Sequence, residues 1–171
     1  MDKQKTPEIL QQEYQALIES QQTLMLASLG KEQMPDASYA PYIRDENGVF
    51  YIYVSELAKH TQNLMRHPYA GIIFIRPEAE SRNLFARERV SFRCQVTEVS
   101  RNEEPYEGLL ENFRDRFGAV VDMLSSLPDF HLLALKPESG SYVVGFGRAY
   151  AIDCESGALQ HIDADQLKAG R

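Results

Sequence analysis

Short segments in which apolar and polar residues alternate, or apolar residues run together, recur along the chain and are typical of β-strands. These segments are 23–29, 37–44, 49–55, 70–75, 87–99, 130–135 and 142–152, with a shorter one at 158–162. Within 87–99, Val90, Phe92, Cys94 and Val96 occupy every second position, so one face of this strand is expected to be buried. The pattern predicts a chain made mainly of β-structure.

Turn-forming residues lie between several of these segments. Asp45-Glu46-Asn47-Gly48 separates two strands, and Asn-Gly supplies the positive φ angles of a tight hairpin. A second turn is predicted at Pro137-Glu138-Ser139-Gly140. Gly145-Phe146-Gly147 is expected to lie inside the last long strand and to let the backbone bend there, because it lacks the third glycine and following helix of a dinucleotide-binding motif.

Helical spacing of apolar residues marks a few insertions between the strands. The predicted helices are 7–20, 57–66, 104–117 and 120–126, with a last helical turn at 163–169. Because helices do not follow every strand, the pattern favours an antiparallel barrel over a doubly wound parallel sheet. We therefore expect one mainly β domain over residues 1–171, with peripheral helices and a tail at 153–171.

Composition and charge exclude several classes of partner. The 171 residues contain 18 basic and 25 acidic side chains, and the net charge of −7 argues against nucleic acid. No apolar run approaches the ~18 residues of a membrane span, and the polar N-terminus lacks an apolar signal core, so a cytoplasmic protein without a membrane partner is expected. Cys94 and Cys154 lie far apart and have no metal-ligand spacing, so neither a disulfide nor a zinc site is expected.

Two groups of cationic residues are candidates for binding an anion. Ser55, Lys59 and His60 lie where a strand leads into a helix, and a helix N-terminus with such partners suits a phosphate or a propionate. Alternatively, Ser55 caps the helix, and Lys59 and His60 are solvated. Arg87 and Arg89, with Arg93 close by, share a strand face that either binds an anionic ligand or is simply hydrated.

The other histidines and the known catalytic motifs give few further candidates for a functional site. His131 lies in an apolar strand and is expected to be packed and hydrogen-bonded, whereas His161 is either a surface residue or a metal ligand. Motifs of hydrolases and phosphoryl-transfer enzymes are absent from the sequence, so any reaction would need a cofactor.

Several segments together resemble a known family. They are Ala37-Ser38-Tyr39-Ala40-Pro41, residues 55–68, Leu84-Phe85-Ala86-Arg87-Glu88-Arg89, Leu127-Pro128-Asp129-Phe130 and Gly145-Phe146-Gly147-Arg148-Ala149-Tyr150. In this order, from about residue 22 to residue 150, they are similar to the HugZ/HutZ-type haem-utilisation proteins, which belong to the pyridoxamine 5'-phosphate oxidase-like split β-barrels.

The resemblance implies a homodimer with cofactor sites at the subunit interface, which binds haem and opens its ring oxidatively with oxygen and an electron donor. It also implies that Asp129 of one subunit orients a histidine that the other subunit places on the haem iron, and that Arg89 lies in the haem site. The family's ligand histidine falls at Gln166 here. Either His161, five residues earlier, serves as the haem-iron ligand, or haem is bound weakly through other groups, or the chain holds flavin instead. The tail at 153–171 is expected near the cofactor.

Two alternatives remain open from the sequence. The chain is an FMN-binding oxidoreductase with Ser55, Lys59 and Arg87 near the FMN phosphate, or it is a haem carrier that does not turn over. Both use the same barrel.

Overall fold

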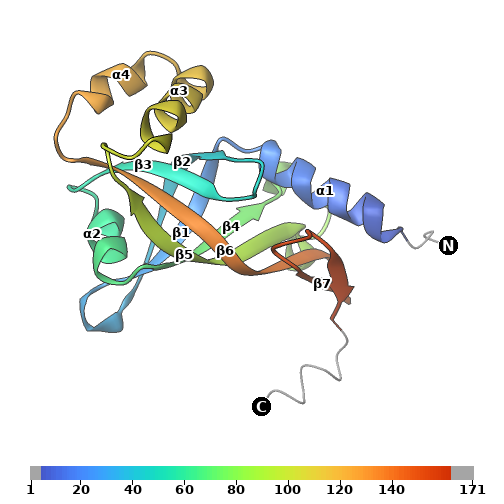
Figure 1. Cartoon of the computed structure of the whole chain (residues 1–171). Coiled ribbons are helices and arrows are strands. Elements are labelled where there is room, and N and C mark those ends of the chain that lie inside the picture. The colour runs from blue at the N-terminus through green and yellow to red at the C-terminus, as the bar shows by residue number, and fades with distance from the viewer. Residues whose placement is uncertain (1–4, 163–171) are drawn as a thin grey trace. The chain divides into compact units, whose positions relative to one another are not determined.

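Strands dominate the computed structural model, which describes residues 5–162 (Figure 1). The strands are β1 (Thr23–Leu29), β2 (Pro35–Arg44), β3 (Phe50–Ser55), β4 (Tyr69–Ile75), β5 (Arg89–Val99), β6 (Phe130–Gly145), β7 (Arg148–Ile152) and β8 (Leu159–His161). The helices are α1 (Pro7–Glu19), α2 (Lys59–Arg66), α3 (Pro105–Phe117) and α4 (Val120–Ser125), with 3₁₀ turns at Lys31–Gln33, Glu78–Glu80 and Leu84–Ala86. The predicted helical turn at 163–169 lies outside the described residues.

The chain divides into two units that are described separately. The barrel unit consists of Gln22–Ile72 and Cys94–Pro137. The terminal unit consists of Met1–Gln21, Ile73–Arg93 and Glu138–Arg171.

Six strands form a closed barrel, and β1, β2 and β3 belong wholly to the barrel unit. They follow the order β3-β2-β1-β4-β5-β6, and a further pairing of β3 with β6 closes the ring. This closing pairing is antiparallel and runs from Phe50 opposite Leu135 to Ser55 opposite Phe130. The predicted mainly β antiparallel barrel is confirmed.

Local sequence explains the first hairpins of the barrel. Exposed and buried residues alternate along β1, with Leu24 and Leu26 inside. The β2–β3 turn contains Gly48 with φ of 81°, and the side chain of Asp45 accepts a hydrogen bond of 2.8 Å from the Val49 N–H. Because a positive φ favours glycine, the Asn47-Gly48 hairpin forms where the sequence predicted it.

Helices α3 and α4 lie together beside the barrel strands, as Figure 1 shows, and enclose an apolar cluster. Tyr53 of β3 contacts the Phe113 ring of α3 at 6.2 Å between centroids, and it shares buried surroundings with Tyr106 and Leu110. Burial of these large side chains is the main force that holds the two helices on the barrel.

In the terminal unit, α1 buries one face and is tied to the strands beside it. Thr6 caps its N-terminus by accepting a hydrogen bond from the Ile9 N–H, and Leu10, Tyr14 and Leu17 are buried. The Tyr14 hydroxyl donates to the Gly157 carbonyl at 3.1 Å. Within this unit β7 pairs with both β6 and β8, so the short strand predicted at 158–162 is confirmed.

The predicted turn at Pro137-Glu138-Ser139-Gly140 is wrong. β6 continues through these residues, because the φ angle of proline is compatible with an extended strand. Gly140 serves close packing instead, since a Cβ there would lie 2.7 Å from two ring carbons of Phe92. The turn lies at Gly145-Phe146-Gly147, which was predicted inside a strand; Gly147 has φ of 65° and connects β6 to β7.

The described residues also bear on the cysteines and on membrane insertion. Cys94 is buried in β5, as the alternating pattern predicted, and both Cys94 and Cys154 are free thiols. Between residues 5 and 162, every helix is too short or too polar to cross a bilayer.

Substitution of Gly140 tests the close approach to Phe92. Gly140→Ala is expected to lower the free energy of unfolding by about 1 to 3 kcal/mol, because the added methyl group overlaps the ring. Gly108→Ala is the matched control: nothing lies within 4 Å of its Cβ position in α3, so about 0.5 to 1 kcal/mol of stabilisation is expected. Urea denaturation measures both, and equal stability of Gly140→Ala and the unmodified chain would contradict the packing account.

Candidate functional site

The pairing of β3 with β6 brings Ser55 and Asp129 together in the barrel unit. The Ser55 hydroxyl donates to Asp129 Oδ2 at 2.7 Å, and Ser55 Oγ accepts from the Leu57 N–H at 3.1 Å. The Glu56 N–H donates to the Asp129 carbonyl oxygen at 2.8 Å. This Ser55–Asp129 junction therefore fixes a half-buried carboxylate through both its side chain and its main chain.

Arg101 holds the loop that carries Asp129. Its Nη2 donates to the carbonyl oxygens of Leu127 at 2.8 Å and Phe130 at 3.3 Å, and Nη1 donates to that of Ser125 at 3.4 Å. The guanidinium suits this role because it presents several donors in a rigid plane. Sequence reasoning missed Arg101, because nothing along the chain indicates that residue 101 meets residues 125–130.

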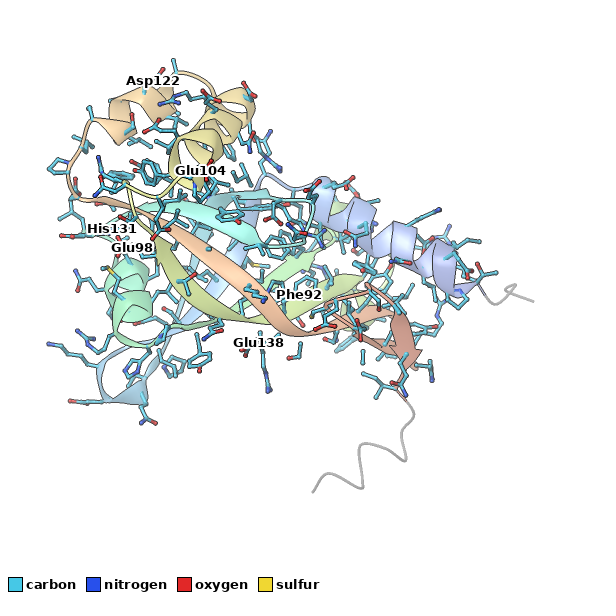
Figure 2. All side chains as sticks on the ribbon, in the orientation of Figure 1. Phe92, Glu98, Glu104, Asp122, His131 and Glu138 are labelled. Carbon is cyan, nitrogen blue, oxygen red and sulfur yellow. The ribbon has the colours of Figure 1, made fainter. Side chains whose placement is uncertain are left out.

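His131 follows the junction in the chain and lies between two carboxylates, one of which, Glu98, is labelled beside it in Figure 2. Its Nδ1 is 2.6 Å from Glu98 Oε1 and its Nε2 is 2.7 Å from Glu56 Oε1. Partial burial acts to lower the pKa of His131, but hydrogen bonds to Glu98 and Glu56 outweigh it and raise the pKa above its ordinary value. The predicted hydrogen-bonded role of His131 is confirmed, and the raised pKa favours a charged ring that pairs with Glu56 and with Glu98 of β5.

The start of α2 does not gather the predicted anion-binding groups. α2 begins at Lys59 after Ala58, without a side-chain cap, so Ser55 does not cap it. Lys59 Nζ forms an exposed ion pair with Asp36 at 3.2 Å. Burial lowers the pKa of His60, and its buried Nε2 has no hydrogen-bond partner among residues 5–162, so a neutral ring is favoured.

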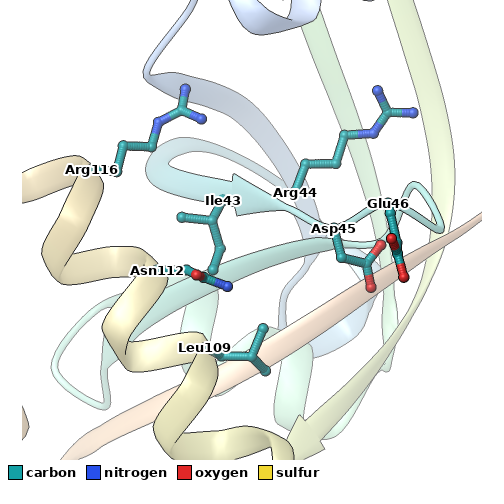
Figure 3. Close-up of a pocket in the computed structure, with 7 residues that line it drawn as sticks. All are labelled: Ile43, Arg44, Asp45, Glu46, Leu109, Asn112 and Arg116. Atoms are coloured by element: carbon teal, nitrogen blue, oxygen red, sulfur yellow. The ribbon is translucent and has the colours of Figure 1, made fainter.

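The pockets that open on the barrel unit include two that could hold a ligand. One, of about 290 Å³, adjoins the junction and is lined by Glu98, Arg101, Tyr106 and His131 among others. The other, of about 520 Å³, lies between the β2–β3 hairpin and α3 (Figure 3).

The larger pocket is lined by both signs of charge. The guanidinium of Arg116 lies 4.8 Å from the centre of the Tyr42 ring, whereas Asp45 and Glu46 contribute carboxylates. Asp45 also accepts a hydrogen bond from Tyr51, and burial together with this carboxylate raises the pKa of Tyr51 to about 12. Because cations and anions offset each other there, this pocket favours neither kind of ligand.

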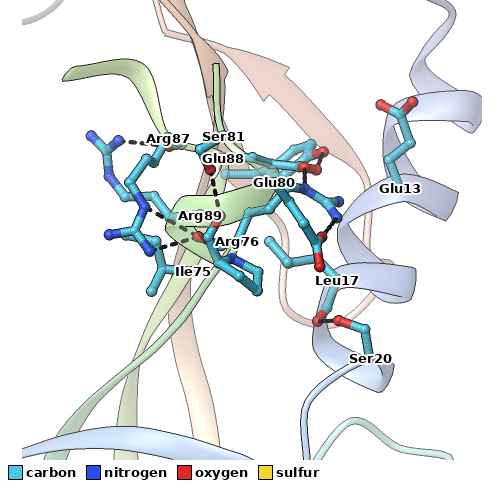
Figure 4. A network of polar contacts seen from close by, with 12 residues as sticks. Glu13, Leu17, Ser20, Ile75, Arg76, Glu80, Ser81, Arg87, Glu88 and Arg89 are labelled. Atoms are coloured by element: carbon cyan, nitrogen blue, oxygen red, sulfur yellow. Dashed lines mark hydrogen bonds and ion pairs between the residues drawn. The ribbon is translucent and has the colours of Figure 1, made fainter. Parts of the chain in front are cut away.

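The arginines of the terminal unit differ in how far they are neutralised (Figure 4). Arg87 precedes β5 and donates to the Arg76 carbonyl oxygen at 3.1 and 2.6 Å, and it pairs with Glu78 at 3.2 Å. Arg89 starts β5 and donates to the Arg87 carbonyl oxygen at 3.0 Å. In the part of the chain that the structure describes, Arg89 forms no ion pair, so its charge remains available to a ligand.

His161, the candidate metal ligand, lies at the end of β8. It pairs with Tyr150, whose ring meets the imidazole edge-on at 5.2 Å. Its Nε2 is 3.2 Å from the Gly147 carbonyl oxygen, a contact in which the ring nitrogen must donate. Gln166, at the position of the family's histidine, lies outside the described residues.

The contacts of His131 predict a pH-dependent contribution to stability. Because folding raises the pKa of His131, its contribution to stability is fully present below the pKa of the imidazole in the unfolded chain, about 6.5. The contribution is lost as the pH rises through the pKa of His131 in the folded chain. His131→Gln should therefore destabilise the chain by about 0.5 to 1 kcal/mol at pH 6 and by less at pH 9. Denaturation at both pH values measures this, with His67→Gln as the control. A larger loss at pH 9 than at pH 6 would contradict the imidazolium interpretation.

Comparison with known proteins assigns the chain to a family. The family model of pyridoxamine 5'-phosphate oxidase matches residues 10–144. Heme oxygenase HutZ of Vibrio cholerae serotype O1 is 36% identical over 143 residues, which make up 84% of this chain and 81% of HutZ.

Solved structures agree in fold. The crystal structure of V. cholerae HutZ, described as a haem storage protein, has a TM-score of 0.70 at 34% identity and covers 75% of this chain and 90% of its own. Campylobacter jejuni ChuZ has a TM-score of 0.82 at 27% identity over 95% of this chain, which spans 65% of ChuZ. The chain therefore belongs to the HutZ-type haem-utilisation family, within the pyridoxamine 5'-phosphate oxidase-like split barrels.

Proposed function

We propose that this chain binds haem and opens its ring oxidatively, so that the iron becomes available for use. The observation that carries the proposal is the fixed carboxylate of Asp129, one oxygen of which remains open to a further hydrogen-bond donor. The name of its relative HutZ, a heme oxygenase, supports the same activity. Because both cysteines are free thiols, as is usual in a reducing compartment, we place the protein in the cytoplasm.

The chemistry of the available side chains suits haem. Arg89 has no carboxylate partner among the described residues and can anchor a haem propionate. Asp129 can accept the N–H of an imidazole from a second copy of the chain, which orients the ring and strengthens its donation to iron. His161 is the candidate imidazole, and it must release the Gly147 carbonyl oxygen for Nε2 to reach iron. Bound haem would supply the iron at which oxygen, the oxidant, is activated with electrons from a donor.

The FMN alternative is less well supported by the same residues. Its phosphate would need the donors of Ser55, Lys59 and Arg87, but the Ser55 hydroxyl donates to Asp129. Arg87 is bound to Glu78 and to a main-chain carbonyl oxygen, and Lys59 is paired with Asp36. A dianionic phosphate beside the Asp129 carboxylate would also be repelled.

A haem carrier without turnover is the second candidate, and one observation favours it. His161 already uses Nε2 in a hydrogen bond, and the crystal structure of HutZ is described as that of a storage protein. Binding alone is common to both proposals, so turnover has to be measured.

Haem binding and turnover test the proposal together. Titration of the purified chain with haem should give a saturable Soret band, and ascorbate with oxygen should then bleach it and release iron. Asp129→Asn should bind haem but turn over about 10 to 100 times more slowly, because the neutral amide accepts the imidazole N–H more weakly and has one acceptor oxygen in place of two. His161→Ala should shift the Soret band.

The controls distinguish the candidates. A persistent Soret band under ascorbate and oxygen indicates a carrier. Binding of FMN in place of haem would contradict the proposal, and an unchanged spectrum in His161→Ala would remove His161 from it.

We also propose that the chain acts as a homodimer through the outer face of β1, β2 and β4. Met25 and Tyr39 are paired across β1 and β2 on this face, and Tyr39 is 66% exposed. Tyr69 of β4 is exposed as well. The outer positions of β5, Gln95 and Thr97, are polar, as usual for a face in water. An apolar outer face fits a second copy of the chain.

A charge on this face tests the dimer. Tyr39→Glu should shift the sedimentation coefficient from dimer towards monomer, because the carboxylate would be buried without a partner. Gln95→Glu adds the same charge to the polar face of β5 and should leave the dimer intact. A dimer that survives Tyr39→Glu unchanged would place the interface elsewhere.

A further inference from the structure

We propose that Ser55 is a positioning residue for Asp129: its hydroxyl sets the direction of the carboxylate that receives the imidazole of the haem ligand. This inference rests on the proposed haem function. Ser55 touches neither haem nor imidazole in this account and acts only through Asp129.

The direction of the Ser55 hydroxyl is determined on both sides. A hydroxyl has one hydrogen to donate and lone pairs to accept with. The hydrogen goes to Asp129 Oδ2 at 2.7 Å, and a lone pair of Oγ receives the Leu57 N–H at 3.1 Å. The main chain thus orients the hydroxyl, and the hydroxyl orients the carboxylate.

Because of this hydrogen bond, the two carboxylate oxygens of Asp129 have different roles. Oδ2 is occupied by Ser55, whereas Oδ1 has no hydrogen-bond partner among residues 5–162. A carboxylate that cannot rotate presents Oδ1 in one direction, so a donor N–H meets it without first ordering the side chain. Without the hydroxyl the carboxylate would sample several rotamers, and the imidazole would be held less well.

The main chain at Asp129 does not depend on Ser55. Arg101 binds the carbonyl oxygens of Leu127 and Phe130, and the Glu56 N–H binds that of Asp129. These contacts remain when the hydroxyl is removed. Loss of the hydroxyl is therefore expected to affect the carboxylate direction and to leave the fold intact.

Three variants of serine residues test the proposal on the full chain with haem. Ser55→Ala should bind haem within about 2-fold of the unmodified affinity but open the ring about 10 times more slowly, as expected for one lost hydrogen bond to a charged group. Its Soret band should move in the same direction as that of Asp129→Asn. Ser55→Thr keeps the hydroxyl and should recover the rate to within about 3-fold. Ser20→Ala, which removes a hydroxyl bound to the Leu17 carbonyl oxygen in α1, should change neither rate nor spectrum.

A double variant separates positioning from a purely structural role. In the Asp129→Asn background, Ser55→Ala should slow the reaction no further, because the residue it positions is already changed. A further 10-fold loss in the double variant, or an unchanged rate in Ser55→Ala, would overturn the proposal.

Failure of the Ser55 proposal can be distinguished from failure of the proposed haem function and from failure of a variant to fold. If the unmodified chain neither binds nor degrades haem, the proposed function fails before Ser55 is tested. If Ser55→Ala does not fold, Ser55→Cys, which keeps the size and only a weak donor, takes its place and should show the same loss of rate. A Ser55→Thr variant that folds but is as slow as Ser55→Ala would also overturn the role of the hydroxyl.

Discussion

The antiparallel pairing of β3 with β6 is the constraint on which the candidate site depends. This pairing closes the six-stranded barrel and puts Ser55 opposite Phe130. Ser55 and Asp129 are 74 residues apart in the chain, yet the register of two strands makes them hydrogen-bonding partners. Because a shift by one residue would turn every side chain to the other face, the buried residues of both strands also protect the site's geometry.

Most polar groups around this junction already have hydrogen-bond partners, and this limits which ligand can bind there. His131 joins Glu56 and Glu98, Arg101 binds main-chain oxygens, and the hydroxyl of Ser55 serves Asp129. A site for a phosphate needs unoccupied donors, and these residues offer few. A fixed carboxylate suits a donor such as an imidazole N–H, which is the requirement of a histidine that binds haem iron.

Much of the fold could be predicted from the sequence, because strands and the Asn47-Gly48 turn depend on neighbours in the chain. Pro137–Gly140 misled the prediction, since proline and glycine mark turns but also occur where a strand must pass close to a ring such as Phe92. Asp129 was predicted by resemblance alone, whereas Arg89 was also a candidate for binding an anion from its charge and its place on a strand. The roles of both stay predictions. Contacts of Arg101 and of Ser55 with Asp129 could not be predicted, because they arise from strand register and loop packing between distant segments.

The most direct test of this account is a crystal structure of the chain with haem bound. We expect a carboxylate oxygen of Asp129 to accept a hydrogen bond from the imidazole on the haem iron, while Ser55 still donates to the other oxygen. A haem bound with Asp129 facing solvent, or an iron ligand with no contact to Asp129, would contradict it.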